Sequence, residues 1–308
     1  MSRSTTLLLT ALAPAIWGST YIITTEFLPG ASPLLLAMLR ALPAGLFLLL
    51  LTRRLPQGIW LARSFILGAL NFSIFWWLLY VAAYRLPGGV AAVIGAAQPL
   101  IVLFLARALL GQTIRPAAIA AGAIGMIGVA LLALTPLAKL DMVGVLAMLA
   151  GAVSMAFGSV LTRKWQPPVS ALTFTAWQLT AGGLLLVPMA LLSAPALPPL
   201  SASSLAALIY LSLIGGGITY FLWFRGIAAL GPATIAPLGL LSPVSAMLLG
   251  WLVLGQVLSP GQTLGMVMVL ASVWLGQRAQ RPQPPSMSAD GTKNSVPVTG
   301  VLTSRMQS

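Results

Sequence analysis

The chain has 308 residues, of which 59% are hydrophobic and 6% are charged, and it carries a net charge of +13. A soluble domain has roughly 25% charged residues, so this composition indicates an integral membrane protein and excludes an ordinary soluble one. The sequence contains no Cys and no His, which excludes disulfides and metal sites built from these residues.

Ten apolar stretches follow one another along the chain, and each is close to the ~20 residues that a helix needs to cross a membrane. Pro and Gly residues separate them, as expected for turns between spans. The expected spans are 5–26, 32–52, 63–83, 88–109, 115–134, 141–162, 170–192, 203–225, 231–254 and 260–277. Residues 278–308 are polar and rich in Pro, Ser and Thr, which predicts a disordered cytoplasmic tail. The pattern predicts an all-α integral membrane protein with ten transmembrane helices.

Basic residues lie at alternate ends of these stretches. If the N-terminus is cytoplasmic, the opposite side of the membrane holds only Arg85 and Lys139. The cytoplasmic ends then hold Arg3, Arg53, Arg54, Arg63, Arg107, Arg115, Arg163, Lys164, Arg225, Arg278 and Arg281. This asymmetry follows the positive-inside rule, so we expect a multi-pass membrane protein with both termini cytoplasmic. Topology and anionic headgroups account for the positive charge, and we expect no nucleic acid partner.

One helical unit occurs twice in the sequence. Residues of the first part recur in the same order and spacing in the second part. The pairs include Leu86 with Leu230, Ala92 with Ala236, Gly95 with Gly239, Pro99 with Pro243, Gly111 with Gly255, Gln112 with Gln256 and Pro116 with Pro260. Spans one to five thus match spans six to ten, which gives repeats at 1–135 and 141–277. An odd number of spans in each repeat predicts that the halves are inverted relative to each other.

Polar side chains inside apolar spans are costly and usually face a cavity or a neighbouring helix. The candidates are Arg40, Asn71, Gln98, Gln178 and Ser242, with Arg40 aligned to Gln178 and Gln98 aligned to Ser242. Arg40 has no acid in the middle of a span to pair with. Two interpretations stay open: Arg40 faces a water-filled cavity or a substrate carboxylate, or it is a structural residue that hydrogen-bonds to helix-end carbonyls.

Aromatic side chains recur at helical spacing on several expected spans. Those that we expect to line a substrate path are Trp17, Tyr21, Trp77, Tyr80, Trp177 and Tyr220. Such rings suit an amphiphilic molecule with an aromatic or aliphatic side chain, or an organic cation. The alternative is an interfacial aromatic belt or ordinary helix packing.

Pro99 and Pro243 occupy matching positions within apolar stretches. Proline loosens the hydrogen bonding of a helix, so we expect the pair to act as hinges for alternating access. The alternative is that these are prolines which a membrane helix simply tolerates.

The three acids, Glu26, Asp141 and Asp290, all lie away from the middle of the expected spans. Coupled exporters usually carry protons on a buried carboxylate, so proton coupling of that kind is disfavoured. The sequence has no P-loop, no zinc motif and no paired intramembrane Asp, which disfavours ATP-driven transport and proteolysis. We therefore expect no enzyme activity, no cofactor and no metal.

Several segments resemble a known family. They are 75–114, which contains Tyr80-Val81-Ala82-Ala83, Ala96-Ala97-Gln98-Pro99 and Leu109-Leu110-Gly111-Gln112, its second copy at 220–257, and Trp17-Gly18-Ser19 in the first span. With these segments the chain resembles the EamA domain of the drug/metabolite transporter (DMT) superfamily and, within it, the YddG-type exporters of aromatic amino acids and methyl viologen. The resemblance implies ten helices, a central cavity between the halves and export from the cytoplasm. Short four-helix members use a Glu in the first helix to bind proton and drug, and this chain lacks such an acid.

The sequence thus predicts a secondary transporter that exports amino acids, favouring aromatic or large apolar ones, and related metabolites by alternating access. Its partners would be a small-molecule substrate and the lipid bilayer, in a monomer or weak homodimer. One alternative is a broad exporter of drugs or organic cations. An alternative of another class is a membrane assembly or lipid-handling subunit that transports nothing.

Overall fold

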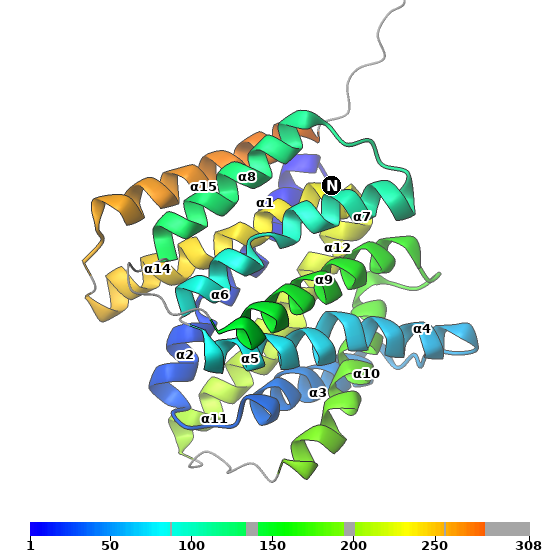
Figure 1. The fold of residues 1–308 in the computed structure, drawn as a ribbon. Coiled ribbons are helices and arrows are strands. Elements are labelled where there is room, and N and C mark those ends of the chain that lie inside the picture. The colour runs from blue at the N-terminus through cyan, green and yellow to red at the C-terminus, as the bar shows by residue number, and fades with distance from the viewer. Residues whose placement is uncertain (87, 134–140, 194–200, 256, 281–308) are drawn as a thin grey trace, which may run out of the picture.

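The computed structural model describes residues 1–86, 88–133, 141–193, 201–255 and 257–280, so most of the expected tail lies outside it. Within these ranges the chain forms a bundle of helices with no strands (Figure 1). The elements are α1 (Arg3–Gly18), α2 (Thr20–Phe27), α3 (Pro33–Thr52), α4 (Ile59–Gly68), η1 (Ala69–Ser73), α5 (Ile74–Arg85), α6 (Gly88–Gly95), α7 (Gln98–Leu110), α8 (Pro116–Ala133), α9 (Met142–Lys164), α10 (Ala171–Leu192), α11 (Ala202–Ile209), η2 (Tyr210–Ile218), α12 (Thr219–Leu230), α13 (Pro232–Ile235), η3 (Ala236–Leu240), α14 (Leu241–Leu254) and α15 (Pro260–Ala279). Elements η1 and η2 are π-helical, and η3 is a 3-10 helix.

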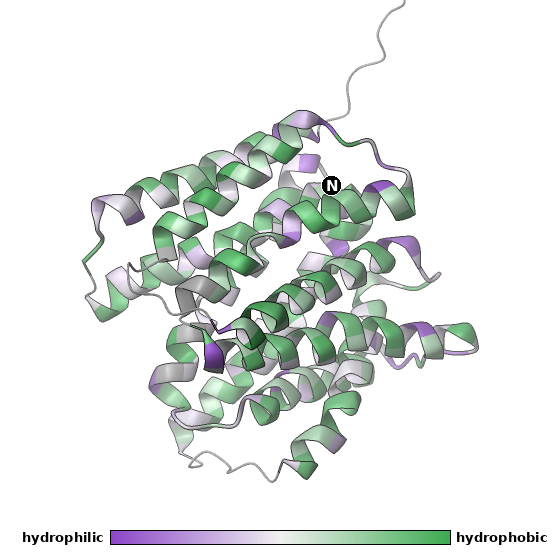
Figure 2. Cartoon of the chain, viewed as in Figure 1, coloured by the Kyte–Doolittle hydropathy of each residue, from purple (hydrophilic) through white to green (hydrophobic). Residues whose placement is uncertain are grey.

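Eight helical stretches among the described residues are long and apolar enough to cross a membrane. They are Arg3–Thr24, Pro33–Thr52, Ile59–Leu79, Ala91–Leu110, Met142–Lys164, Ala171–Leu192, Ala202–Leu230 and Pro232–Leu254. The fifth expected span corresponds to the shorter apolar helix Pro116–Leu132, and the tenth corresponds to α15, which is not among the eight. Figure 2 shows hydrophobic residues along most of each helix and hydrophilic residues mainly near helix ends. The all-helical membrane fold is confirmed, and the count of ten spans stays a prediction.

The helices of each half pack extensively on helices of the other half. Helix α1 packs on α12 and α14 of the second half, and its counterpart α9 packs on α5 and α7 of the first. Likewise α3 packs on η2, and its counterpart α10 packs on α4 and η1. The most extensive contacts join α3 to α10 and α8 to α15, which are also counterparts. A two-fold relation between the halves produces this pattern, because every contact then occurs twice with the roles exchanged.

Glycines allow α3 and α10 to cross at short distance. A Cβ atom added at Gly45 would lie 2.4 Å from the backbone nitrogen of Thr180, and one added at Gly183 would lie 2.7 Å from the Cα of Leu42. Gly45 aligns with Gly183 in the repeat, and Leu42 aligns with Thr180. Small residues let membrane helices approach closely. At this crossing the two close contacts are made by residues that the repeat aligns with each other.

Contacts near the helix ends show that the halves are inverted. Arg225 near the end of α12 contacts Met1 just before α1, so α12 ends where α1 begins. Arg163 near the end of α9 hydrogen-bonds to the Ala228 carbonyl of the same α12. Helix α9 therefore ends at the face where α1 begins, and the two counterparts run in opposite directions.

Both ends of the described chain lie at this same face of the bundle. Arg3 Nη2 at the start of α1 donates to the Gln277 carbonyl in the last turn of α15 at 3.3 Å. Arg115 Nη1 donates to the Ala279 carbonyl at 2.9 Å, which brings another basic residue to the end of α15. We call this face, which carries Arg3, Arg115, Arg163 and Arg225, the basic face.

Irregular helical segments recur at matching places. The third and eighth expected spans each contain a π-helical segment, η1 and η2, between two α-helices. The fourth and ninth are interrupted between α6 and α7 and at η3, close to Pro99 and Pro243. The first span breaks at Ser19, whereas its counterpart α9 is continuous. The repeat therefore governs most of the backbone, and the halves differ at the first span.

Candidate functional site

Six aromatic side chains gather where α1, η1, α5 and α12 meet. This central aromatic cluster consists of Trp17, Phe72, Trp76, Tyr220, Trp223 and Phe224. The ring centre of Tyr220 lies 4.7 Å from that of Phe72 and 4.9 Å from that of Trp17. Tilted and edge-on pairs at such separations are favourable beyond the area they bury. Both halves contribute, because α1, η1 and α5 belong to the first half and α12 belongs to the second.

Arg40 of α3 lies at the edge of this cluster. Its Nη2 donates a hydrogen bond to the Gly215 carbonyl at 2.8 Å, and its Cζ lies 5.1 Å from the centre of the Trp76 ring. Its Nε is buried and has no hydrogen-bond partner among the described residues. The carbonyl contact agrees with the structural interpretation of Arg40, except that Gly215 lies within the π-helical η2 and not at a helix end.

Consecutive glycines let η2 approach α3. A Cβ atom added at Gly216 would lie 2.9 Å from the backbone oxygen of Arg40, and one added at Gly217 would lie 3.7 Å from the Cβ of Ala44. A side chain at Gly216 would push α3 away and would carry the guanidinium away from its carbonyl. The glycine run therefore positions Arg40.

A second side chain shares the Gly215 carbonyl. Thr219 Oγ1 donates to this oxygen at 2.8 Å, and Trp17 Nε1 donates to Thr219 Oγ1 at 2.9 Å. A carbonyl oxygen has two lone pairs, so it accepts from Arg40 and Thr219 together. One oxygen of the second half thereby connects α3, α12 and α1.

Gln178, the counterpart of Arg40, makes a different contact. Asn71 Nδ2 donates to Gln178 Oε1 at 2.9 Å and to Thr162 Oγ1 at 3.2 Å. The side chains of Asn71 and Gln178 are both fully buried. A Cβ atom added at Gly158 would lie 2.2 Å from Asn71 Oδ1, so α9 covers the pair closely. The structure thus places two predicted substrate contacts in a sealed polar contact between η1, α9 and α10.

Two predicted aromatic contacts lie away from the central aromatic cluster. Trp177 Nε1 donates to the Arg54 carbonyl at 2.6 Å, and its ring lies 6.5 Å from that of Phe174. Trp77 is 40% exposed, on a different face of α5 from the buried Trp76. These positions match the alternative of packing and an interfacial belt.

The remaining predicted substrate contacts and hinges lie where the fourth and ninth spans are interrupted, or their side chains lie outside the described part of the structure. Gln98 opens α7, and Ser242 lies in the first turn of α14. Pro99 and Pro243 follow them directly, and their role as hinges stays a prediction. The side chains of Tyr21 and Tyr80 lie outside the described part of the structure.

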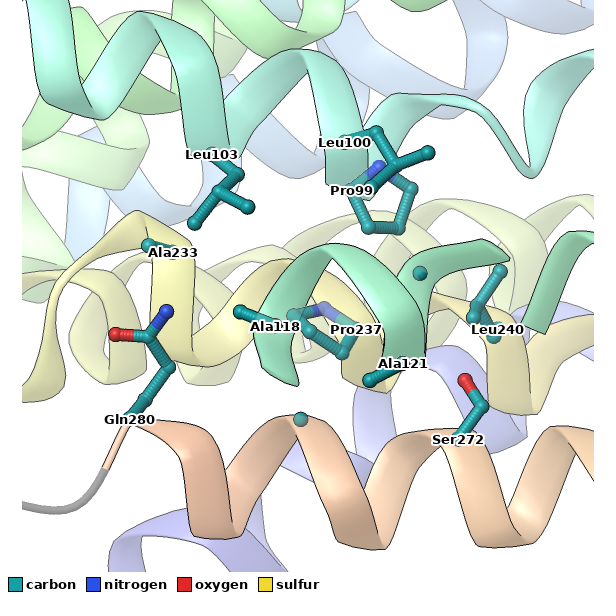
Figure 3. Close-up of a pocket in the computed structure, with 12 residues that line it drawn as sticks. Pro99, Leu100, Leu103, Ala118, Ala121, Ala233, Pro237, Leu240, Ser272 and Gln280 are labelled. Carbon is teal, nitrogen blue, oxygen red and sulfur yellow. The ribbon is translucent and has the colours of Figure 1, made fainter. Parts of the chain in front are cut away.

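A small hollow lies between α7, α8, η3 and α15 (Figure 3). Its walls are mostly apolar, with Pro99 and Leu103 on one side and Pro237 and Leu240 on the other. Residues of both halves line it, and the central cavity that the resemblance implies stays a prediction. None of the predicted substrate contacts is among its lining residues, and Pro99 is the one predicted hinge that is.

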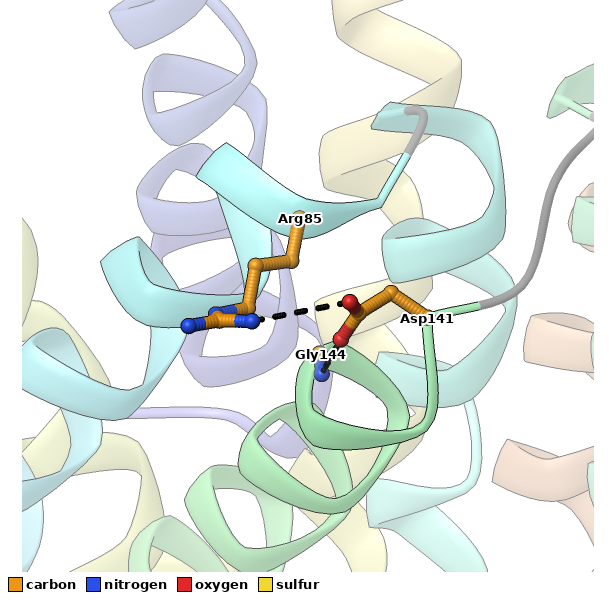
Figure 4. A network of polar contacts seen from close by, with 3 residues as sticks. All are labelled: Arg85, Asp141 and Gly144. Atoms are coloured by element: carbon orange, nitrogen blue, oxygen red, sulfur yellow. Dashed lines mark hydrogen bonds and ion pairs between the residues drawn. The ribbon is translucent and has the colours of Figure 1, made fainter.

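No salt bridge joins Arg40 to an acid in the part of the chain that the structure describes. Asp141 caps α9 by accepting from the Gly144 backbone N–H at 2.8 Å, and it pairs with Arg85 at 3.5 Å (Figure 4). Glu26 is exposed in the last turn of α2. In the described part of the structure, Arg40 therefore contacts the Gly215 carbonyl and the face of the Trp76 ring, and it contacts no carboxylate.

The predicted substrate contacts did not include five residues of this site, namely Phe72, Trp76, Thr219, Trp223 and Phe224. The repeat alignment sets Trp76 opposite Tyr220, and this signal could have found it. The predicted substrate contacts included the neighbouring Trp77 instead. In η1 three consecutive residues, Asn71–Ser73, are buried, and a π-helical turn is wider than an α-helical one. Counting with the α-helical period across such a turn does not select the buried face.

Known proteins carry the same duplicated unit. The EamA-like transporter family matches this chain twice, at residues 4–134 and 142–276. Protein PecM of Dickeya dadantii is 45% identical over 267 residues, which cover 86% of this chain and 90% of that protein. The uncharacterized inner membrane transporter YedA of Escherichia coli is 31% identical over 266 residues, 84% of this chain and 86% of the relative. The probable amino-acid metabolite efflux pump of Salmonella typhimurium is 24% identical over 278 residues, 87% and 93% of the two chains.

A solved crystal structure shares the fold. It superposes with a TM-score of 0.77 at 21% sequence identity, and the match covers 89% of this chain and 99% of that chain. At this identity the likeness concerns the fold alone. The paired match to one family, the inverted helical halves and a relative at 45% identity agree with one another. The chain belongs to the EamA-like transporter family of the DMT superfamily, and it is a multi-pass membrane protein.

Proposed function

We propose that this chain exports amino acids and related metabolites from the cytoplasm across the bacterial inner membrane, favouring aromatic or large apolar amino acids. The observation that carries the proposal is Arg40 at the edge of the central aromatic cluster, inside the helical bundle of a transporter family. A guanidinium suits a carboxylate, and aromatic rings suit an apolar side chain. The name of the Salmonella relative refers to the same class of substrate.

Inverted halves support alternating access as the mechanism, because equivalent gates at the two faces can open in turn. Pro99 and Pro243 stand at matching interruptions, where a helix can bend without breaking many hydrogen bonds. By the positive-inside rule the basic face would lie in the cytoplasm, together with both termini. The substrate would pass the central aromatic cluster between the two openings.

The described spans supply no carboxylate near Arg40, which supports flow along the substrate gradient without a buried proton carrier. The test uses the purified full chain in liposomes, with labelled phenylalanine, tryptophan, leucine and glycine at a fixed substrate gradient. We expect flux of the three large amino acids above that of protein-free liposomes, unchanged by an imposed pH gradient. Flux that requires the pH gradient contradicts the facilitator, and absence of flux for every amino acid contradicts amino acid export.

A second candidate function is the export of organic cations, which the aromatic faces of the cluster would favour through cation–π contacts. Arg40 argues against it, because a like charge at the same cluster repels a cationic substrate. Methyl viologen added in excess should leave phenylalanine flux unchanged. Strong competition by methyl viologen would favour the cation exporter.

The non-transporting alternative makes no use of the central aromatic cluster. Trp17→Ala removes a ring that contacts Tyr220 and Trp223. We expect this variant to lose most of its amino acid flux while it still elutes as a single species in detergent. Unchanged flux in Trp17→Ala and in Tyr220→Ala would favour a protein without transport of its own.

A further inference from the structure

We propose that Arg40 selects substrates that carry a free carboxylate, and that the carboxylate replaces the Gly215 carbonyl as the hydrogen-bond acceptor of the guanidinium. This inference rests on the proposed function and adds to it the chemical group that the site recognises. It also assigns a switchable contact, since Arg40 would hold α3 to η2 only while no carboxylate is bound.

The charge of Arg40 is the first reason. A guanidinium inside a membrane bundle loses hydration, and a neutral carbonyl with a ring face offsets that loss only in part. Of the two acids in the described ranges, Asp141 pairs with Arg85 and Glu26 is exposed at the end of α2. A carboxylate brought by the substrate is therefore a stronger partner for Arg40 than its present one.

Unpaired donors are the second reason. Arg40 Nε and Trp223 Nε1 are both buried, and neither has a hydrogen-bond partner in the part of the chain that the structure describes. The Trp223 ring lies 5.1 Å from Trp17, which belongs to the same hydrogen-bond relay as Arg40. Buried donors normally find acceptors, and a carboxylate accepts without donating. A surplus of donors thus points to a ligand made of acceptors.

Because Thr219 shares the Gly215 carbonyl, Arg40 can exchange this acceptor for a substrate carboxylate at a small cost in free energy. Gly215 O accepts from Thr219 Oγ1 at 2.8 Å as well as from Arg40. When Arg40 turns to a carboxylate, the carbonyl keeps its bond to Thr219 and is not left unsatisfied, which is what usually makes breaking a buried hydrogen bond costly. Thr219 in turn keeps its own contact with Trp17 Nε1.

The second half of the chain shows that helix packing at the position of Arg40 does not require a charged side chain. Gln178 stands at the position of Arg40, and it meets Asn71, which the repeat aligns with Gly215. Gln178 is fully buried, whereas Arg40 is partly exposed. A neutral amide, whose Nε2 has no hydrogen-bond partner among the described residues, therefore occupies the same crossing where the site is fully buried, and the charged arginine occupies the crossing that is partly exposed.

The experiment measures equilibrium binding to the purified full chain in detergent, through its tryptophan fluorescence. The probes are phenylacetate and phenylacetamide, which share a ring and differ in the carboxylate. We expect the wild-type protein to bind phenylacetate at least about tenfold more tightly than phenylacetamide, as a charge-assisted contact predicts. Arg40→Gln, which copies the residue of the second half, should bring this ratio close to one. Arg40→Lys should keep part of it, and Arg85→Gln, an arginine outside the cluster, should keep all of it.

Equal binding of both probes by the wild-type protein overturns the proposal, and so does an unchanged ratio in folded Arg40→Gln. If Arg40→Gln does not elute as a single species, Arg40→Met decides: a ratio equal to that of the wild type would show that the charge at this position does not select the carboxylate. Failure of the proposed function would look different. In that case liposomes would show no amino acid flux, while the preference for phenylacetate and its loss in the variants could still be present.

Discussion

Arg40 and Gln178 occupy the same position in the two halves and meet the same point of a facing helix, yet their surroundings differ. Arg40 donates to the Gly215 carbonyl beside aromatic rings, whereas Gln178 accepts from Asn71 in a site that α9 covers. The crossing of α3 with α10 is itself symmetric down to its glycines. The repeat therefore sets the backbone of both sites, and the side chains make one a partly exposed charged site and the other a fully buried neutral one.

Moving the charge to the sealed site tests this comparison most severely. Gln178→Arg would bury a guanidinium beside Asn71 and Thr162, with no carboxylate among the described neighbours. We expect a loss of several kcal/mol in the free energy of unfolding, because an uncompensated buried charge cannot be hydrated. The measurement is the yield and thermal midpoint of the purified protein in detergent.

The matched control for that variant is Arg40→Gln, which removes a charge at the equivalent position of the other half. It should purify normally with a midpoint close to that of the wild type, since an amide can still donate to the Gly215 carbonyl. A Gln178→Arg protein as stable as the wild type would mean that water reaches both sites, and the contrast between the halves would be lost.

Removing the neutral contact should have a moderate effect on stability and little effect on transport. Asn71→Ala removes the Nδ2 group that donates to Thr162 Oγ1 and to Gln178 Oε1, and Gln178 Oε1 keeps only its bond from Thr162, so we expect a cost of about 1–3 kcal/mol in the free energy of unfolding. Flux per folded molecule should stay near the wild-type value, because the contact is sealed. Gln98→Ala is the control for stability alone, since that amide has no hydrogen bond among the described residues and is itself a predicted substrate contact. Loss of flux in Asn71→Ala at unchanged stability would place Asn71 in the substrate path.

A smaller effect is expected from the hydroxyl that shares the Gly215 carbonyl. Thr219→Val keeps the shape of the side chain and removes its hydrogen bonds to Gly215 and from Trp17. Without Thr219, release of Arg40 leaves the carbonyl unsatisfied, so phenylacetate should bind several-fold more weakly, equivalent to about 1 kcal/mol. Binding of phenylacetamide should not change.

Thr175→Val is the matched control for this hydroxyl. Thr175 is buried and donates to the Ala171 carbonyl of its own helix at 2.8 Å, as Thr219 does to Gly215, but in α10. It should lower stability by a similar amount and leave phenylacetate binding unchanged. If both variants weaken the binding of phenylacetate equally, the weaker binding reflects a general loss of stability, and the shared Gly215 carbonyl has no part in binding.

The sequence anticipated the features that depend on composition and register. Matched Gly and Pro positions predicted the duplicated unit, and the odd number of spans predicted its inversion, because these follow from chain order alone. The contact of Arg40 with a carbonyl was one of two open interpretations. The sequence could not identify Gly215 as the residue that supplies this carbonyl, because a π-helical segment such as η2 has no sequence periodicity that distinguishes it from an α-helix. Trp17 and Trp177 both lie within apolar spans, and the sequence does not distinguish them. Only the folded structure shows that Trp17 donates to Thr219 in the central aromatic cluster, whereas Trp177 donates to the Arg54 carbonyl outside it.

The smallest effect should come from the ion pair that joins the halves away from the basic face. Arg85→Gln removes the contact with Asp141, but both side chains are substantially exposed, at 48% and 40%. We expect the thermal midpoint to shift by an amount equivalent to less than about 1 kcal/mol. Asp141→Ala should cost more, about 0.5–2 kcal/mol, because it also removes the cap on the Gly144 N–H. If Arg85→Gln proved as costly as Asp141→Ala, the ion pair, and not the cap on the Gly144 N–H, would account for the effect of Asp141 on stability.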